Sequence, residues 1–219
     1  DVMPESIDAL LITHEHVDHT KGAGVISRRY NIPIYTTQGT HTSMDIGNIA
    51  DENIKIITED TDFEIGNIGI CPFAIPHDAA QPVGFNFMIG GEKYSLATDI
   101  GQITKSILEN ITGSKKILKK SNHDVEMLKC GTYPYPLKRR ILGEYGHLSN
   151  ETASKVALHL VQNGTEHIML GHLSKENNYE ALAYETVCSE VTLGDNPYRS
   201  KDFQIQVAKR DSISDVVVL

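Results

Sequence analysis

The sequence has no tryptophan, few cysteines and no long apolar run, and each shortage excludes a class of protein. Cys71, Cys130 and Cys188 form no CxxC pair and are odd in number, so a disulfide framework is not expected and a reducing, cytoplasmic setting is favoured. No apolar stretch approaches the roughly 18 residues of a membrane span, so no membrane partner is expected. With 40% hydrophobic and 22% charged residues, the chain has the composition of a globular protein, and residues 1–219 suit one domain.

Positive charge is scarce overall but concentrated in one segment. The net charge is −9, yet residues 111–140 hold eight basic residues against two acidic ones. An acidic body with one basic segment can bind a polyanion locally. A solvated lysine-rich helix and loop accounts for the same pattern equally well.

Short apolar stretches precede helical patterns along the chain. Strands are expected at residues 7–13, 32–35, 54–57, 63–65, 68–75, 83–89, 93–97, 168–170, 203–208 and 216–219. Helices are expected at residues 22–30, 103–111, 124–128, 150–162 and 175–191. Strands come first and helices alternate with strands later, which indicates an α/β fold built in layers.

Histidine is abundant, with ten residues, and some of them cluster. Residues 13–19 read Thr-His-Glu-His-Val-Asp-His and directly follow the first expected strand. Imidazole suits zinc, iron or manganese, and an added carboxylate lets such a cluster serve two ions. The motif therefore predicts a metal site at the end of a rigid strand.

Three further polar residues, His77, Asp99 and His172, each follow an apolar stretch. Strands of an α/β fold place their sites at one sheet edge, so these side chains are expected to meet there. Each residue alone is more often structural than functional. Taken with the first motif, the three residues complete a metal-ligand set.

The order of these residues, HxHxDH followed by His77, Asp99 and His172, resembles the metallo-β-lactamase superfamily of binuclear metallohydrolases. The resemblance implies a four-layer αββα sandwich with two divalent metal ions at one edge. Zinc is the default ion, and manganese or iron are alternatives. The resemblance implies one metal held by His14, His16 and His77, another held by Asp18, His19 and His172, and Asp99 bridging the two. Asp99 stands in place of the cysteine of antibiotic-hydrolysing members, which argues against a lactam substrate.

A closer resemblance rests on residues 120–128, 133–138 and 146–150. These segments resemble the YycJ/WalJ group, whose relatives include ribonuclease Z, ribonuclease J and the phosphodiesterase PhnP. The resemblance implies a nuclease, chiefly a 5′ exonuclease on DNA. Two departures stand out. The first strand pair of such proteins is missing here, so the first sheet is expected to have an exposed edge, and Lys120 stands where an acidic residue is expected.

The expected reaction is hydrolysis of a phosphodiester by a hydroxide that bridges two metals. Asp18 and Asp99 are expected to fix the metals and orient the hydroxide. His147 or His123 is expected to protonate the leaving oxygen, because both are spare imidazoles within the matching motifs.

Substrate residues are predicted from two segments. His147, Ser149 and Asn150 precede or open a helical pattern and form an expected phosphate pocket, with a plain helix N-cap as the alternative. The run Lys138, Arg139 and Arg140, near two tyrosines, is expected to follow a nucleic-acid backbone, with a solvated basic turn as the alternative.

Three functions compete at this stage. The leading hypothesis is a metal-dependent phosphodiesterase, with DNA as the first and RNA as the second substrate. The second is a metallohydrolase of small esters, thioesters, lactones or cyclic phosphodiesters. The third is a non-catalytic interaction module, which the complete ligand set disfavours. A monomer and a homodimer are both compatible with the sequence.

Overall fold

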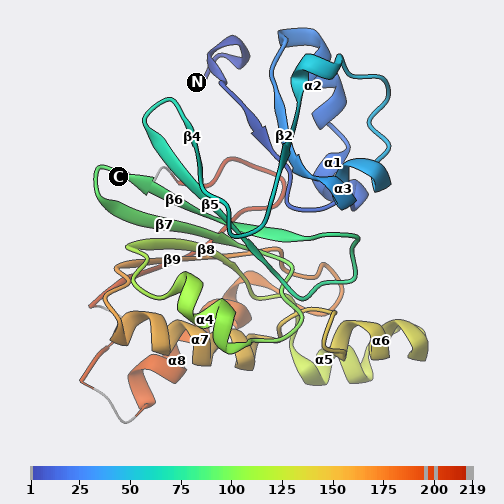
Figure 1. Cartoon of the computed structure of the whole chain (residues 1–219). Helices are drawn as coiled ribbons and strands as arrows, with labels where there is room; N and C mark the ends of the chain where they lie inside the picture. Colours follow the sequence, from blue (N-terminus) through green and yellow to red (C-terminus); the bar gives the residue numbers. More distant parts are fainter. Residues whose placement is uncertain (1, 195–196, 200–201, 216–219) are drawn as a thin grey trace.

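The computed structural model describes residues 2–194, 197–199 and 202–215, and its strands form two sheets that face each other (Figure 1). The smaller sheet is parallel and has the order β1-β2-β3. Its strands are β1 (Leu10–Leu11), β2 (Ile34–Thr37) and β3 (Ile54–Ile57). The larger sheet has the order β10-β9-β8-β7-β6-β5-β4. Its strands are β4 (Phe63–Ile65), β5 (Ile68–Ala74), β6 (Val83–Ile89), β7 (Glu92–Ala97), β8 (Lys116–Lys120), β9 (His167–Gly171) and β10 (Gln204–Val207).

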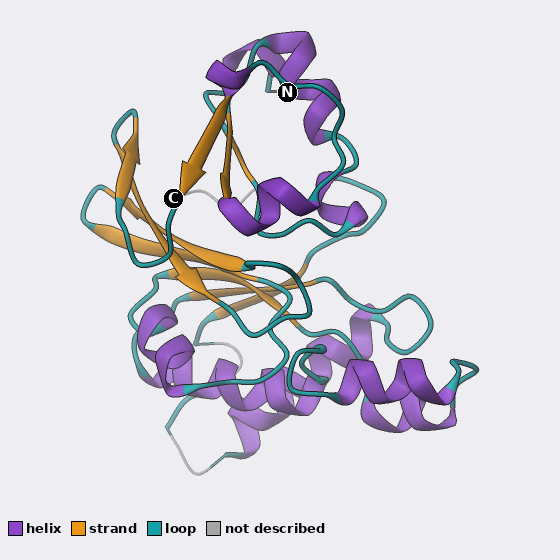
Figure 2. Ribbon diagram, turned by 45° about the vertical axis from the view of Figure 1, so that its right-hand side comes forward, coloured by secondary structure: helices purple, strands orange, loops and turns teal. Residues whose placement is uncertain are grey.

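Helices lie outside both sheets, as the view by secondary structure shows (Figure 2). Beside the smaller sheet are α1 (Val17–Thr20), α2 (Ala23–Tyr30) and α3 (Gln38–Ser43), with 3-10 turns at Pro4–Ser6 and Asp51–Asn53. Below the larger sheet in Figure 1 are α4 (Lys105–Ile111), α7 (Asn150–Gln162) and α8 (Glu180–Leu193), and toward one side α5 (Val125–Cys130) and α6 (Tyr135–Leu142). No helix in these described ranges is long and apolar enough to cross a membrane.

Three apolar clusters fill the spaces between the layers. One joins the smaller sheet to its helices and contains Ile12, Ala23 and Ile34. A second lies between the sheets and contains Ile57, Ile70, Val83 and Phe85, with Leu11 and Tyr35 packed against it. The largest joins the larger sheet to α4, α7 and α8 and includes Ile107, Leu160, Ile168 and Val187. The four-layer αββα arrangement expected from the sequence is confirmed.

Several element boundaries differ from the expected ones. The first strand pairs only over Leu10–Leu11, the second begins at Ile34, and α8 begins at Glu180 instead of residue 175. The late start of α8 has a local cause, because residues 175–177 form a turn, and Ser174 Oγ accepts a hydrogen bond from Asn177 N at 3.2 Å. Helix α6 was not expected, and the strand expected at residues 216–219 lies outside the described residues.

The lysine-rich segment is the main correction to the sequence prediction. Residues 116–120 do not form a solvated helix and loop; they form β8, which lies between β7 and β9 inside the larger sheet. Lys119 is 2% exposed and Lys120 is 0% exposed. Lys119 donates to the carbonyl of Ala153 on α7, and burial lowers its pKa to about 7. The positive charge of the segment is therefore not gathered on one surface.

Strand direction determines where the polar strand ends lie. Strands β7, β8, β9 and β10 run parallel, so their carboxyl ends meet at one edge of the larger sheet. Asp99, residues 121–122, His172 and residues 208–211 follow these strands at that edge. This edge is where ligand sites of α/β sheets are found.

Candidate metal centre

The histidine-rich loop after β1 is fastened to the larger sheet. Thr13 O accepts a hydrogen bond from Val83 N at 2.9 Å, and Glu15 Oε1 accepts one from Ala80 N at 2.7 Å. Helix α1 then begins at Val17, which places Asp18 and His19 on its first turn. Glu15, inside the motif but not a predicted ligand, thus ties the loop to the segment that carries His77.

Two of the predicted ligands have an unusual backbone. Asp99, two residues after β7, and His172, directly after β9, have φ of 51° and 57°, in the left-handed region. Non-glycine residues there cost roughly 1–2 kcal/mol each. The conformation turns the chain at the end of the strand, at the edge where the other ligands lie.

The structure brings all seven predicted ligands together. They fall into overlapping groups whose ligand atoms lie within 4.8 Å of one another: His14, His16 and His77; His14, His19 and Asp99; Asp18, His19 and His172. His16 Nδ1 lies 3.0 Å from His14 Nε2 and 3.3 Å from His77 Nε2. His172 Nε2 lies 3.1 Å from His19 Nε2 and 3.3 Å from Asp18 Oδ2.

Neighbouring groups orient the imidazoles. His77 Nδ1 donates to the carbonyls of Tyr145 and Gly146, at 3.1 and 3.3 Å, so its Nε2 is the nitrogen that faces the centre. His14 Nδ1 lies 3.0 Å from Thr13 Oγ1, which leaves Nε2 facing the centre in the same way. Partners of this kind fix ring orientation in metal sites.

The protonation states suit metal ligands. Burial lowers the pKa of His14 to about 3 and also lowers the pKa of His77 and His172, so these imidazoles are neutral at neutral pH. Burial alone would raise the pKa of Asp99, but the neighbouring His19, whose Nε2 lies 3.3 Å from Oδ2, and the charge of Lys120 outweigh burial and lower it. The centre thus offers neutral imidazoles and ionised carboxylates, the forms that bind metal.

The residues fit two divalent ions. Imidazole nitrogens of neighbouring histidines face one another at 3.0–3.1 Å, and Asp99 Oδ2 is buried with no hydrogen bond of good geometry from the described residues. A buried carboxylate oxygen left in this way calls for a positive partner. Nitrogen and oxygen donors together suit zinc, manganese or iron.

His147 also belongs to this centre. It groups with His77 and Asp99, and its Nδ1 lies 3.7 Å from Asp99 Oδ1. Burial and, to a smaller extent, the charge of neighbouring Lys120 lower the pKa of His147 to about 2. At neutral pH His147 is therefore a neutral imidazole.

Three other predicted residues lie elsewhere. His123 is 1% exposed and pairs with Ser149 through an isolated bridge. Ser149 is the N-cap of α7 and accepts a hydrogen bond from Thr152 N at 3.2 Å, while Asn150 Oδ1 accepts one from Ser121 Oγ at 2.7 Å. None of these three side chains is among the described residues that line the cleft, and Ser149 acts as the N-cap that was the alternative.

A cleft of about 940 Å³ opens onto the centre. His16, Asp18, Asp99, His147 and His172 line it from the metal centre. Its basic lining residues are Arg140, Lys175, Lys209 and Arg210, its acidic ones outside the centre are Asp78, Glu180 and Asp211, and its tyrosines are Tyr133 and Tyr179. Lys175, Lys209 and Arg210 were not predicted, because they lie in loops after β9 and β10 without a motif of their own.

The three residues of the predicted basic run, Lys138, Arg139 and Arg140, lie on α6 but have different surroundings. Only Arg140 lines the cleft, where its Nε donates to Asp78, a carboxylate whose Oδ1 is 3.4 Å from His77 Nε2. Lys138 Nζ donates to the carbonyls of Lys129 and Gly131, both at 2.7 Å, and so covers the end of α5. Arg139 is exposed and is not among the cleft residues.

The comparisons with known proteins agree with this fold. The model of the beta-lactamase superfamily domain matches residues 3–172, and the chain belongs to that superfamily, in the class of metallo-β-lactamase-fold hydrolases. It is 39% identical over 183 residues to exodeoxyribonuclease YycJ of Bacillus anthracis, covering 83% of this chain and 69% of that protein. It is 37% identical over 196 residues to exodeoxyribonuclease WalJ of Streptococcus pneumoniae, covering 88% and 73%. The metallo-β-lactamase fold protein YhfI of Bacillus subtilis shares the fold, with a TM-score of 0.67 and 15% identity over 95% of this chain and 77% of that one.

Proposed function

We propose that the protein is a metal-dependent phosphodiesterase that acts as a 5′ exonuclease on DNA, with RNA as the second candidate substrate. The observation that carries the proposal is the cluster of histidine and aspartate side chains at a cleft that basic and tyrosine side chains also line. Relatives named exodeoxyribonuclease at 37–39% identity support the same substrate.

The centre would hold two divalent ions. His14, His16 and His77 would hold one, Asp18, His19 and His172 the other, and Asp99 would lie between them. When bound, two such ions supply Lewis acidity and a hydroxide nucleophile at neutral pH. No serine or cysteine nucleophile is then required.

The protein's own groups position the substrate at this centre. The carboxylate of Asp18 lies beside His172 and that of Asp99 beside His19, where both would hold the metal ions and orient the attacking hydroxide. His147 lies at the cleft surface beside Asp99, where a neutral imidazole can donate a hydrogen bond to a phosphate oxygen. Because burial lowers its pKa, we propose this donor role for His147 instead of protonation of the leaving oxygen.

The walls of the cleft suit a nucleic-acid strand. Arg140, Lys175, Lys209 and Arg210 can neutralise phosphates, and Tyr133 and Tyr179 offer rings on which bases stack. The basic side chains therefore bind the backbone near the centre, although the protein as a whole carries a net charge of −9.

The test combines elemental analysis with an assay on 5′-labelled single- and double-stranded DNA. We expect bound divalent metal and stepwise release of 5′ nucleotides. His16→Ala should lose both metal and turnover, whereas His41→Ala, which changes a histidine outside the cleft lining, should keep both. Turnover of a thioester or lactone with none of DNA, or full activity in His16→Ala, would overturn the proposal.

A further inference from the structure

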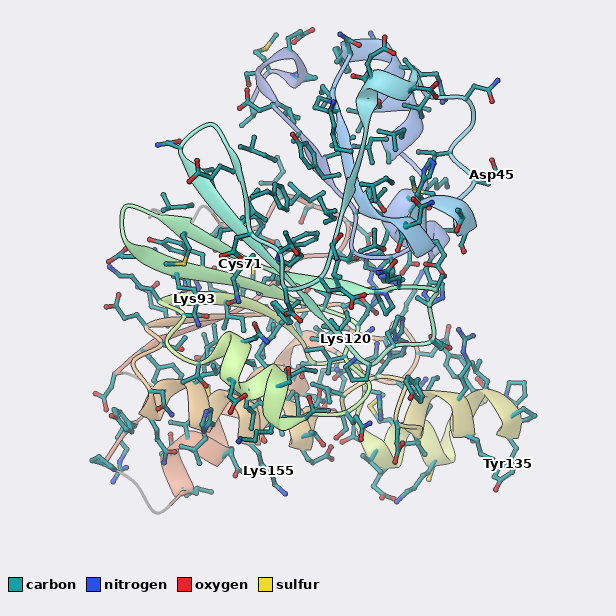
Figure 3. The ribbon with its side chains drawn as sticks, viewed as in Figure 1. Asp45, Cys71, Lys93, Lys120, Tyr135 and Lys155 are labelled. Atoms are coloured by element: carbon teal, nitrogen blue, oxygen red, sulfur yellow. The ribbon has the colours of Figure 1, made fainter. Side chains whose placement is uncertain are left out.

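Lys120 is a buried cation at the metal centre. It ends β8, between β7 and β9, and is 0% exposed. Figure 3 shows it in the interior of the molecule, whereas Tyr135 on α6 lies at the periphery. A buried ammonium is costly unless it is paired, so its partners show what it does.

Among the described residues, the Lys120 amine has two hydrogen-bond partners, and both belong to the centre. Its Nζ donates to Asp99 Oδ1 and lies 2.7 Å from His147 Nδ1. An ammonium has three donors and no acceptor. His147 Nδ1 is therefore the acceptor, and the proton of this neutral imidazole is on Nε2.

The two oxygens of Asp99 face different sides of the centre. Oδ1, which Lys120 occupies, is 3.9 Å from His77 Nε2. Oδ2 is 3.3 Å from His19 Nε2 and 3.6 Å from His172 Nε2, and it accepts no hydrogen bond of good geometry from the described residues. Asp99 thus has a free oxygen only toward the group of Asp18, His19 and His172.

We propose that Lys120 is a positioning residue that makes the two metal sites unequal. Its charge occupies the oxygen of Asp99 that faces the site of His14, His16 and His77, so that site binds its ion more weakly than the other. Lys120 also keeps His147 Nδ1 as an acceptor, which withholds His147 from metal binding and leaves its Nε2–H as a donor. The inference rests on the metal centre of the proposed function.

The first test is a zinc titration of the full chain against a chromophoric chelator, with Lys120→Met and Lys120→Arg. We expect two zinc ions of unequal affinity in the wild type. Lys120→Met removes the competing charge, so the weaker site should tighten about tenfold or more, while Lys120→Arg should keep the inequality. A purely structural role predicts the opposite sign, because a damaged centre binds both ions more weakly. Unchanged or weakened binding in Lys120→Met overturns the inference.

The second test reads the tautomer of His147 by nitrogen-15 NMR of the zinc-loaded protein. We expect an unprotonated Nδ1 and a protonated Nε2, with no shift of the kind a zinc ligand shows. A protonated Nδ1 or a zinc-ligand signal overturns the inference. Either failure leaves metal content and DNA turnover of the wild type intact, whereas a wild type that binds no zinc overturns the proposed function as well.

Discussion

His123 is a buried imidazole outside the cleft lining. Its Nε2 has no hydrogen-bond partner among the described residues, and burial lowers its pKa to about 4. The charges of Glu151 and Asp124 oppose this lowering, and that of Lys120 adds to it. His123 therefore acts on stability, and its contribution depends on pH.

We expect His123 to make the folded state sensitive to acid. The unfolded histidine takes up a proton near pH 6.5, and the folded one only near pH 4. Below pH 6.5 the unfolded chain binds more protons, so the free energy of unfolding falls as pH falls, by up to about 1.4 kcal/mol per pH unit. Urea denaturation of the metal-free protein between pH 7 and 4.5 should show a shallower fall for His123→Asn than for the wild type. Other titrating groups are common to both proteins. An equal pH dependence of the free energy of unfolding in the two would therefore contradict the lowered pKa of His123.

The grouping of the proposed metal ligands was predictable at this scale, because their sequence signals are local. The HxHxDH motif lies in one loop, and His77, Asp99 and His172 each follow an apolar strand. Asp78 and Lys120 were not assigned to the centre, because their place in it depends on what lies beside them in space. The available sequence signal for Asp78 was its position directly after the predicted ligand His77.

Strand β8 shows why the lysine-rich segment misled sequence reasoning. Lysines favour solvent, and successive side chains of a strand point to opposite faces. Lys119 reaches α7, and Lys120 reaches the metal centre. Both lysines are buried because their amines find specific acceptors, which residue type alone cannot predict. The apolar strands and long helices were predictable because their periodicity reflects burial on one face.

At the scale of paired strands, the position of Gly84 on β6 leaves no room for a side chain, because Phe73 on β5 lies opposite it. A Cβ at this position would overlap the ring of Phe73, which is 1% exposed. Gly84→Ala should lower the free energy of unfolding by about 1–3 kcal/mol through overpacking. Gly69→Ala on β5 is the matched control, because its Cβ would meet Met88 at an ordinary 3.4 Å. Chemical denaturation would contradict the argument if both variants were equally stable.

The loops after β9 and β10 are expected to carry substrate binding. Lys175→Gln with Lys209→Gln removes two cations that line the cleft, so the KM for DNA should rise several-fold. The logarithmic salt dependence of binding should become shallower by about one for each lost phosphate contact.

Lys155→Gln is the control for that pair, because Lys155 is exposed on α7 and is not among the cleft residues. Its KM and salt dependence should match the wild type. A control that weakens binding as much as the double variant would show that net charge, not the cleft wall, controls affinity.

Across the whole molecule, the metal centre joins the two sheets. His14, His16 and His19 come from the loop and helix after β1 of the smaller sheet, while His77 and His172 follow strands of the larger sheet. Bound metal stabilises only the folded state, so EDTA should lower the Tm by roughly 5–10 °C. His16→Ala should show little further change with EDTA, and an equal drop in that variant would contradict a stabilising role of the metal.

The order of the ligands along the chain also gives the centre a direction of assembly during biosynthesis. His14, His16 and His77 have all left the ribosome by the time that His77 emerges, and His172 leaves about a hundred residues later. A nascent polypeptide therefore carries every donor of one site long before β9 delivers the last donor of the other. Metal capture by the growing polypeptide is expected to be sequential, and a product stalled before residue 172 would hold at most one ion.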